Sequence, residues 1–303
     1  MVTLRSLVVF ILVLVITLNF TSAFLRHAKS GLMCPDRAVC YEQVALSGEG
    51  MAPTGEGSES FSIATMAHRL IASTIAILVL ALNIMLFRSA PLAPSSRRLA
   101  LIMGGAVLWL SALGMSAGGS LGPGVTLGNL AGGLLLLVSS AILALKLNGA
   151  SPPTAPAWGI RNIAGVALLL MLFLQGGFIS TAFSGMSCPT VPSCGGSWWS
   201  NIPLLQMQLF HRLSVVIVLV YFAQLLYRSY QQGTPLQQRF LLGVLLLMLL
   251  QGLLGSAITV LNLPLLSTTM HTLLSQLLIT LFVASLFITS DKPLTTIESK
   301  PNG

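Results

Sequence analysis

Eight apolar segments, each about as long as a helix that crosses a bilayer, constrain the fold of this 303-residue chain more than any other feature. About 20 apolar residues cross the hydrocarbon core as an α-helix. Charged residues make up 7% of the chain, against roughly 25% in soluble domains. We therefore predict an all-α polytopic membrane protein with eight transmembrane helices. They cover roughly 7–24, 61–87, 99–117, 126–147, 163–183, 204–227, 240–262 and 267–289.

The basic residues predict topology and not nucleic-acid binding. The net charge is +8, but the Lys and Arg residues are spread thinly over several connections and form no stripe. If the eight spans alternate, most of them fall on one side, and the positive-inside rule then places both termini in the cytoplasm. Arg5 before an apolar core also resembles a signal peptide. We keep this segment as a span, because seven helices would break the symmetry described next.

The chain contains an internal repeat. Residues 30–40 and 184–194 share the pattern SGxxCPxxxxC, and the helix that follows each copy carries His-Arg-Leu, at 68–70 and at 211–213. Two matched motifs in the same order indicate duplication. We predict two pseudo-symmetric four-helix bundles in tandem, the N-terminal half at 1–150 and the C-terminal half at 160–290. A cytoplasmic linker at 151–159 joins the halves, and a cytoplasmic tail covers 291–303.

Three histidines are the main candidates for chemistry, because ionisable residues inside a membrane are costly and no Asp or Glu falls within the predicted spans. His211 and His271 each lie about two turns from the outer end of their helix, so they share a depth. Two imidazoles at one level suit axial ligation of a heme iron, and Arg212 could meet a propionate. His68 and Arg69 hold the equivalent places in the first half. Hydrogen bonds across helices are the structural alternative, and zinc fits less well without a third ligand at that depth.

The two halves differ in their last helices. Thr126-Leu127-Gly128-Asn129 corresponds to Thr268-Thr269-Met270-His271, so Asn129 stands where the second half has a histidine. The second half therefore has two histidines, whereas the first has one histidine and an amide. His27 has no repeat partner, and we expect it to be a solvated residue of the outer loop.

All four cysteines fall on the predicted outer side, which is oxidising in bacteria: Cys34, Cys40, Cys188 and Cys194. Their spacing suits one small disulfide loop in each half. A redox-active pair that exchanges with a partner thiol is the alternative.

Together, these motifs resemble the heme A synthase family over about residues 15–290. They include the SGLMCPD…CY and CGGSWW loop patterns, the two His-Arg openings and His271 at the start of an apolar helix. The resemblance implies an eight-helix enzyme of cytochrome oxidase assembly that oxidises a methyl group of heme O to the formyl group of heme A. It implies heme b held by His211 and His271, and substrate heme beside His68. Heme O synthase and oxidase assembly factors are the implied partners.

The resemblance has two departures, both in the first half. The family's second N-terminal histidine aligns with Asn129, or with Gly128 after a one-residue slip, and the family's Glu three residues before His68 is replaced by Thr65. Glu59 lies nine residues before His68 and could reach back only if the helix begins late or the loop folds inward. A single axial ligand leaves the iron position that oxygen activation requires.

These departures leave other functions open. One is a heme b-binding relative without synthase activity, used for electron transfer, heme handling or oxidase assembly. Another is a membrane thiol or quinone oxidoreductase that uses the outer cysteine pairs, and a solute transporter is a weaker possibility. We expect a bacterial plasma membrane, because no Arg/Ser-rich transit leader is present, and a homo-oligomer is compatible with the sequence.

Overall fold

The computed structural model describes residues 2–47, 49–53, 55, 57–88, 94–116, 122–150 and 159–288. Most of the predicted linker and the whole predicted tail lie outside this part. Within it, the chain is helical, without a named strand. The elements are α1 (Val2–His27), the short π-helical turn η1 (Ala28–Leu32), α2 (Arg37–Ser47), α3 (Gly57–Arg88), α4 (Pro94–Ser116), α5 (Pro123–Leu147), α6 (Ile160–Thr181), α7 (Pro203–Gln232), α8 (Pro235–Val260) and α9 (Leu265–Ile288).

Eight helices of the described part are long and apolar enough to cross a membrane, namely α1 continued through η1, and α3 to α9. The prediction of an all-α, multi-pass membrane protein is therefore confirmed. Proline opens several of these helices, including α5, α7 and α8. The first turn of a helix tolerates proline because its N–H groups have no intrahelical acceptor.

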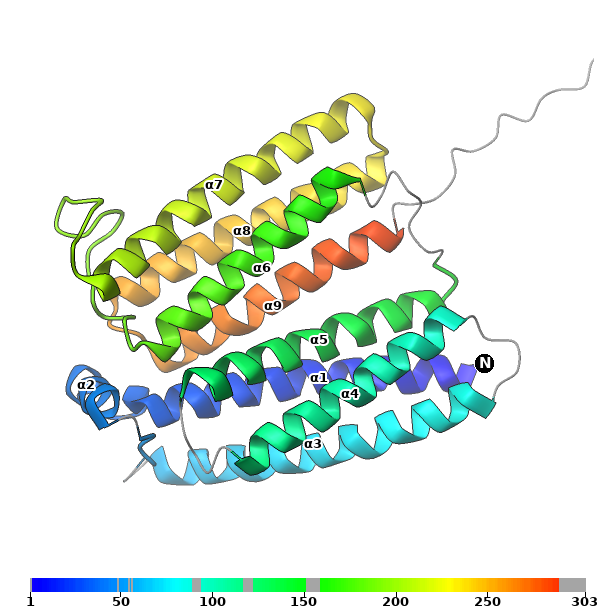
Figure 1. Cartoon of the computed structure of the whole chain (residues 1–303), viewed down its shortest axis with the longest axis horizontal. Helices are drawn as coiled ribbons and strands as arrows, with labels where there is room; N and C mark the ends of the chain where they lie inside the picture. The colour runs from blue at the N-terminus through cyan, green and yellow to red at the C-terminus, as the bar shows by residue number, and fades with distance from the viewer. Residues whose placement is uncertain are drawn as a thin grey trace, which may run out of the picture.

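The spanning helices pack as two rings of four. In the first ring α1 contacts α3 and α5, and α4 contacts the same two helices; in the second, α6 and α8 each contact both α7 and α9. Figure 1 shows the two groups one above the other with their axes roughly aligned. In this arrangement α3 lies diagonally opposite α5, and α7 lies diagonally opposite α9. Side chains that point inward from a diagonal pair therefore face each other across a bundle.

Each ring has a buried apolar cluster, and α5 contributes to both. Leu136, Leu137 and Leu143 belong to the first cluster, whereas Leu130 and Leu134 belong to the second. The rings meet where α5 and α1 contact α9, and where α5 contacts α6. At the last contact, a Cβ on Gly177 would lie 2.8 Å from a methyl carbon of Leu127, so the glycine allows the helices to approach.

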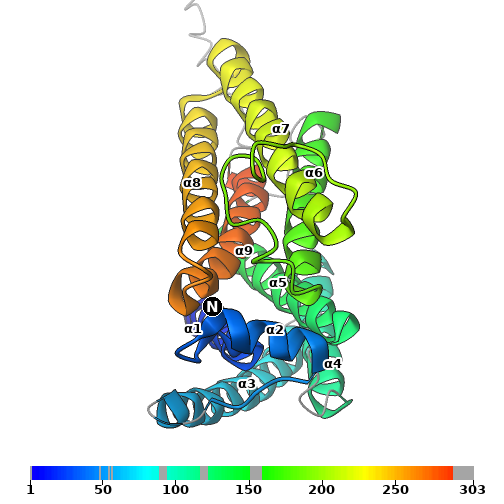
Figure 2. The same ribbon diagram turned by 90° about the vertical axis from the view of Figure 1, so that its left-hand side faces the viewer.

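Helix α2 lies at one end of the molecule, beside the connection between α6 and α7 (Figures 1 and 2). We call this end, which carries α2 and residues 182–202, the loop end. Although α2 belongs to the first half of the sequence, it packs on residues of the second half. Tyr41 is buried against Phe183, with their ring centroids 5.2 Å apart, and it shares an apolar cluster with Leu263.

The glycine of the repeated SGxxCP pattern has a structural role in each copy. Gly31 has a φ of +86°, and a Cβ there would lie 2.8 Å from the backbone carbon of Cys40. A Cβ on Gly185 would lie 2.9 Å from Leu263 and 3.1 Å from the Tyr41 hydroxyl. Gly31 thus closes its own cysteine loop, whereas Gly185 leaves space for the α2 helix of the other half.

Candidate functional site

His211 and His271 lie on the diagonal of the second ring. Further along the same helices, Phe222 of α7 and Phe282 of α9 meet across the diagonal with ring centroids 4.9 Å apart. Each phenylalanine follows its histidine by 11 residues. Eleven residues are about three helical turns, so each histidine lies on the same face of its helix as its phenylalanine, about 16 Å away. The two histidines therefore face the same axis at the same level, and we call them the histidine layer.

The helices that flank this layer place glycines against both imidazoles. A Cβ on Gly176 of α6 would lie 3.9 Å from Cε1 of His211, and a Cβ on Gly255 of α8 would lie 3.3 Å from Cε1 of His271. A larger residue at either position would fill space beside an imidazole. Both flanking helices thus leave room at the level where the two histidines face each other.

Both imidazoles have a polar atom without a partner. Nδ1 of His211 and Nδ1 of His271 are enclosed by protein and make no hydrogen bond within the described ranges. An unsatisfied buried polar group costs about 1–3 kcal/mol, and such groups in a native fold call for an explanation, such as a missing ion or ligand. The two orphaned imidazoles and the two facing glycines fit a flat, metal-containing group between α7 and α9.

Two glutamines support the layer, and the sequence reasoning assigned no role to them. Gln175 of α6 donates from Nε2 to the Ser214 hydroxyl at 3.2 Å, and Gln251 of α8 donates from Nε2 to the carbonyl of His271 at 3.3 Å. The side-chain oxygen of each glutamine is buried without a partner in the described structure. The signal in the sequence is a Gln-Gly pair inside each of two apolar helices, at Gln175-Gly176 and at Gln251-Gly252.

A cleft of about 310 Å³ lies next to the layer, between α6 and α7. Gln175 and Phe178 line it from α6, and Met207 and Phe210 line it from α7. Gln175 and Phe210 each precede a residue of the site, Gly176 and His211. The cleft therefore borders the histidine layer on its α6–α7 side.

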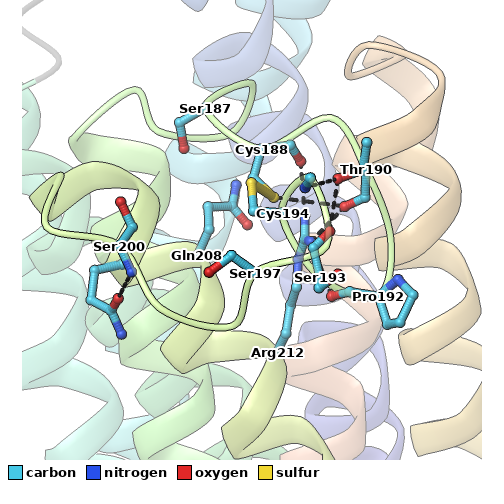
Figure 3. The surroundings of a disulfide bond; sticks show 12 residues. Ser187, Cys188, Thr190, Pro192, Ser193, Cys194, Ser197, Ser200, Gln208 and Arg212 are labelled. Atoms are coloured by element: carbon cyan, nitrogen blue, oxygen red, sulfur yellow. Dashed lines mark hydrogen bonds between the residues drawn. A yellow bond between two sulfur atoms is a disulfide. The ribbon is translucent and has the colours of Figure 1, made fainter.

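Arg212, which follows His211, is directed into the second cysteine loop. Its guanidinium donates to the carbonyls of Thr190 at 2.6 Å, Pro192 at 3.2 Å and Cys188 at 2.8 Å (Figure 3). The structure thus uses Arg212 to hold the loop against α7. A contact between Arg212 and a propionate stays a prediction.

The cysteines are joined within each half, Cys34 to Cys40 and Cys188 to Cys194. Cys188 is fully buried, whereas the other three are half-buried. Within the described residues, no group of three or more His, Cys, Asp and Glu side chains gathers as a metal site.

The first ring places its candidate residues differently. His68 of α3 is half-buried, and its Nδ1 lies 3.3 Å from the Thr21 hydroxyl of α1. Arg69 is exposed. The Thr65 hydroxyl donates to the Phe61 carbonyl of its own helix at 2.8 Å. His68 therefore has a hydrogen-bond partner, in contrast to both histidines of the second ring.

Asn129 lies on α5, diagonally opposite the helix of His68, and it is half-buried. Side chains of α4 pack against the glycines near it in the sequence: a Cβ on Gly128 would lie 2.7 Å from Leu113, and a Cβ on Gly132 would lie 2.8 Å from Leu110. Trp109 also donates from Nε1 to the Gly128 carbonyl at 3.2 Å. The glycines near Asn129 thus serve the contact between α4 and α5.

Glu59 does not replace the carboxylate that Thr65 lacks. Helix α3 begins at Gly57, so Glu59 lies in its first turn and is exposed. Nine residues of helix separate it from His68, or about 14 Å. The late helix start that would let Glu59 reach back is not observed.

The expectation that His27 is a solvated loop residue is wrong. Helix α1 extends to His27, whose side chain is 5% exposed, with Nε2 lying 3.1 Å from the Thr272 hydroxyl of α9. The apolar run of the sequence ends before α1 does, because the last turn of the helix is covered by the second ring and not by lipid. His27 thus links α1 of the first ring to α9 of the second, at Thr272, the residue that follows His271.

Helix α2 carries a tyrosine with a shifted pKa at this junction. Burial raises the pKa of Tyr41 to about 12, because desolvation disfavours the tyrosinate. The hydroxyl therefore stays protonated under physiological conditions, and Tyr41 acts as a packed anchor of α2.

Comparisons with known proteins agree with this architecture. Residues 6–283 match the model of the cytochrome oxidase assembly protein family (COX15-CtaA). The chain is also 26% identical to a protein named heme A synthase from Shewanella oneidensis, over 294 residues that cover 82% of this chain and 87% of the relative. The match to the family model extends from α1 into α9 and takes in both histidines of the layer. The chain therefore belongs to the heme A synthase family of cytochrome oxidase assembly proteins.

Proposed function

We propose that this protein is a heme A synthase-type membrane oxidoreductase, in which the second ring binds heme b between His211 and His271. The observation that carries the proposal is the pair of half-buried imidazoles across the α7–α9 diagonal, each with a buried and unpartnered Nδ1. Gly176 and Gly255 support it, because they leave room beside both rings. A heme in this place would supply one-electron chemistry tuned by its two axial imidazoles.

The residues around the layer hold together the helices that carry the histidines. Gln251 holds the His271 backbone to α8, and Gln175 joins α6 to α7 three residues beyond His211. Phe222 and Phe282 close the diagonal on the side away from the loop end. Arg212 ties the turn that follows His211 to the second cysteine loop. These contacts hold the histidine layer between four helices, and the second cysteine loop covers it at the loop end.

In the first ring, we propose that heme O is received beside His68 and that its methyl group is oxidised to the formyl group of heme A. His68 faces no second histidine, because Asn129 occupies the diagonal position on α5. A single axial ligand leaves one iron position open, as oxygen chemistry requires. The likeness to a heme A synthase supports this assignment.

A second candidate is a heme b-binding relative without synthase activity, which would serve electron transfer, heme handling or oxidase assembly. It is favoured by the close packing of α4 on the helix of Asn129, where Leu110, Leu113 and Trp109 pack against the glycines of α5. It is also favoured by Thr65, whose hydroxyl is engaged by its own helix. In this case the second ring alone would bind a cofactor.

The topology that we propose places both termini in the cytoplasm and both cysteine loops on the outer face of a bacterial plasma membrane. The distribution of basic residues supports it, and so does the position of both cysteine loops at one end of the molecule (Figure 1). The disulfides then face an oxidising compartment. Heme O synthase and oxidase assembly factors are the proposed partners, and the burial of Cys188 favours a structural role for its disulfide over thiol exchange.

Coexpression with a heme O synthase tests the choice between the two candidates. Hemes extracted from the detergent-purified chain are separated by chromatography and identified by their pyridine hemochrome spectra. The synthase predicts heme A that disappears in His68→Ala while heme b remains. Heme b without heme A would favour the second candidate, and a chain without any heme would contradict both.

A further inference from the structure

Arg26 places a guanidinium at the junction of the two rings. This residue of α1 donates from one terminal nitrogen to the Ser180 hydroxyl of α6 at 3.3 Å, and from the other to the Thr272 hydroxyl of α9 at 3.3 Å. Nε2 of His27 lies 3.1 Å from the same second nitrogen. The guanidinium is surrounded by protein, although part of the side chain remains accessible.

The charge of Arg26 is not balanced by a carboxylate. Among the described residues, no Asp or Glu lies within ion-pair distance of it, and its partners are hydroxyl groups and an imidazole. An arginine inside a membrane protein is costly and is normally paired. A buried charge left without its partner destabilises a fold strongly. The cluster of Arg26, His27, Ser180 and Thr272 is therefore built for an anion.

The position of this cluster relates it to the histidine layer. Thr272 directly follows His271 on α9, and Ser180 lies four residues beyond Gly176 on α6, or about 6 Å towards the loop end. Arg26 thus enters the second ring between α6 and α9, within about one turn of the layer. Both helices border the space in which the imidazoles face each other.

The other candidate arginines are placed differently. Arg212 donates to three carbonyls of the cysteine loop, and Arg69 is exposed. A heme carries carboxylates at one edge of its ring, and a guanidinium binds a carboxylate with two parallel hydrogen bonds. The Thr272 hydroxyl accepts from Arg26 and donates to the Thr268 carbonyl at 3.2 Å, so the guanidinium supplies the donors for a carboxylate, which only accepts.

We infer that Arg26, held in place by His27 and Thr272, binds a propionate of the heme held by His211 and His271. This inference rests on the proposed heme b site. It makes the last turn of α1 part of the second ring's cofactor site, so neither half of the duplicated sequence would form that site alone. Arg26 acts here as a binding and positioning residue that contacts the cofactor's edge.

The test compares heme b with its dimethyl ester, which has the same ring but no charged propionates. The purified chain is loaded with either heme, and the rate of heme loss is measured by transfer to excess apomyoglobin. With heme b, Arg26→Gln should release heme about tenfold faster, which corresponds to about 1.4 kcal/mol, and Arg26→Lys should lie between the two. Wild type should already lose the dimethyl ester fast, and Arg26→Gln should not increase the rate of that loss further.

The matched control is Arg37→Gln, because Arg37 is also at the junction but donates to the Leu261 carbonyl. It should release both hemes at wild-type rates. If Arg26 has only a structural role, Arg26→Gln should speed the loss of both hemes equally, and this result would overturn the inference. Equal release of the two hemes by wild type would overturn it without any variant. A wild-type chain that holds no heme b at all would instead contradict the proposed function.

Discussion

Six side-chain nitrogen or oxygen atoms are buried without a hydrogen-bond partner in the described structure, and two of them belong to the histidines of the second ring. Many hydroxyl side chains of the apolar helices donate to a backbone carbonyl of their own helix, as those of Thr269 and Ser285 do. His211 and His271 instead keep an unpartnered nitrogen in an enclosed position. Each such atom costs about 1–3 kcal/mol, which a protein can tolerate where a ligand offsets it.

Filling the space beside His271 should block the cofactor. A Cβ on Gly255 would itself lie 3.3 Å from the imidazole, and Gly255→Leu adds three more carbon atoms beyond it. The content of heme b per chain should therefore fall at least severalfold. Gly252→Leu is the control on the same helix, because nothing lies within 4 Å of a Cβ at that position. The measurement is the pyridine hemochrome spectrum of protein purified in detergent. Equal heme content in the two variants would contradict the role of Gly255.

Much of the histidine layer could be predicted from the sequence, because helical rise converts sequence position into depth. Arg26 and His27 could not be found in this way. Their polarity marks the end of a lipid-facing run, and nothing local indicates that α6 and α9 cover them. The loop contacts of Arg212 could not be predicted either, because its position next to His211 suggested a propionate, whereas its guanidinium donates to the loop carbonyls.

At the scale of elements, the second cysteine loop depends on α7. Three hydrogen bonds from Arg212 hold the carbonyls of Cys188, Thr190 and Pro192, and Gln208 adds bonds to the carbonyls of Ser184 and Gly185. Arginine can satisfy several carbonyls at once because its donors form a planar fork. The loop is therefore positioned by side chains of the helix that carries His211.

Arg212→Ala should lower stability through this loop. Loss of the hydrogen bonds should reduce the free energy of unfolding by about 1–3 kcal/mol, seen as a decrease of a few degrees in the thermal midpoint in detergent. Arg69→Ala is the matched control, because it holds the same motif position but is exposed. If both variants melt at the same temperature, the anchoring role of Arg212 is wrong.

Helix α2 offers a test that depends on pH. The pKa of Tyr41 is raised to about 12 by burial. The unfolded side chain ionises near pH 10, so the contribution of Tyr41 to stability is complete below pH 10 and is lost as the pH rises through 12. The measurement is the tyrosinate absorbance at 295 nm for wild type minus Tyr41→Phe. The difference should titrate near pH 12, and a midpoint near 10 would show that α2 is not docked.

The eight spans follow from composition, because only a helix satisfies the backbone in lipid. Helix α2 was not predicted, since its short polar sequence contains no apolar run. Its buried side chains, Tyr41 and Val44, find their surroundings only in the folded molecule. The same holds for Gly185, which is small because Tyr41 comes from the other half.

At the scale of the whole molecule, the two rings have the same arrangement of helices but carry different residues at corresponding positions. Each places one helix diagonally opposite another, and each has its own apolar cluster. The second ring has two histidines on its diagonal and a glycine on each of the two flanking helices, α6 and α8. The first has His68 hydrogen-bonded to Thr21, and its glycines are packed by α4. This asymmetry agrees with the proposal of a resident cofactor in the second ring.

The most direct test of the account is the heme content and electron paramagnetic resonance spectrum of the purified chain and three variants. Wild type should contain low-spin heme b with two histidine ligands. His211→Ala and His271→Ala should each abolish that signal, while His68→Ala should retain it, because His68 lies in the other ring. The account would be contradicted by an unchanged low-spin signal in both His211→Ala and His271→Ala, or by a wild-type chain that binds no heme.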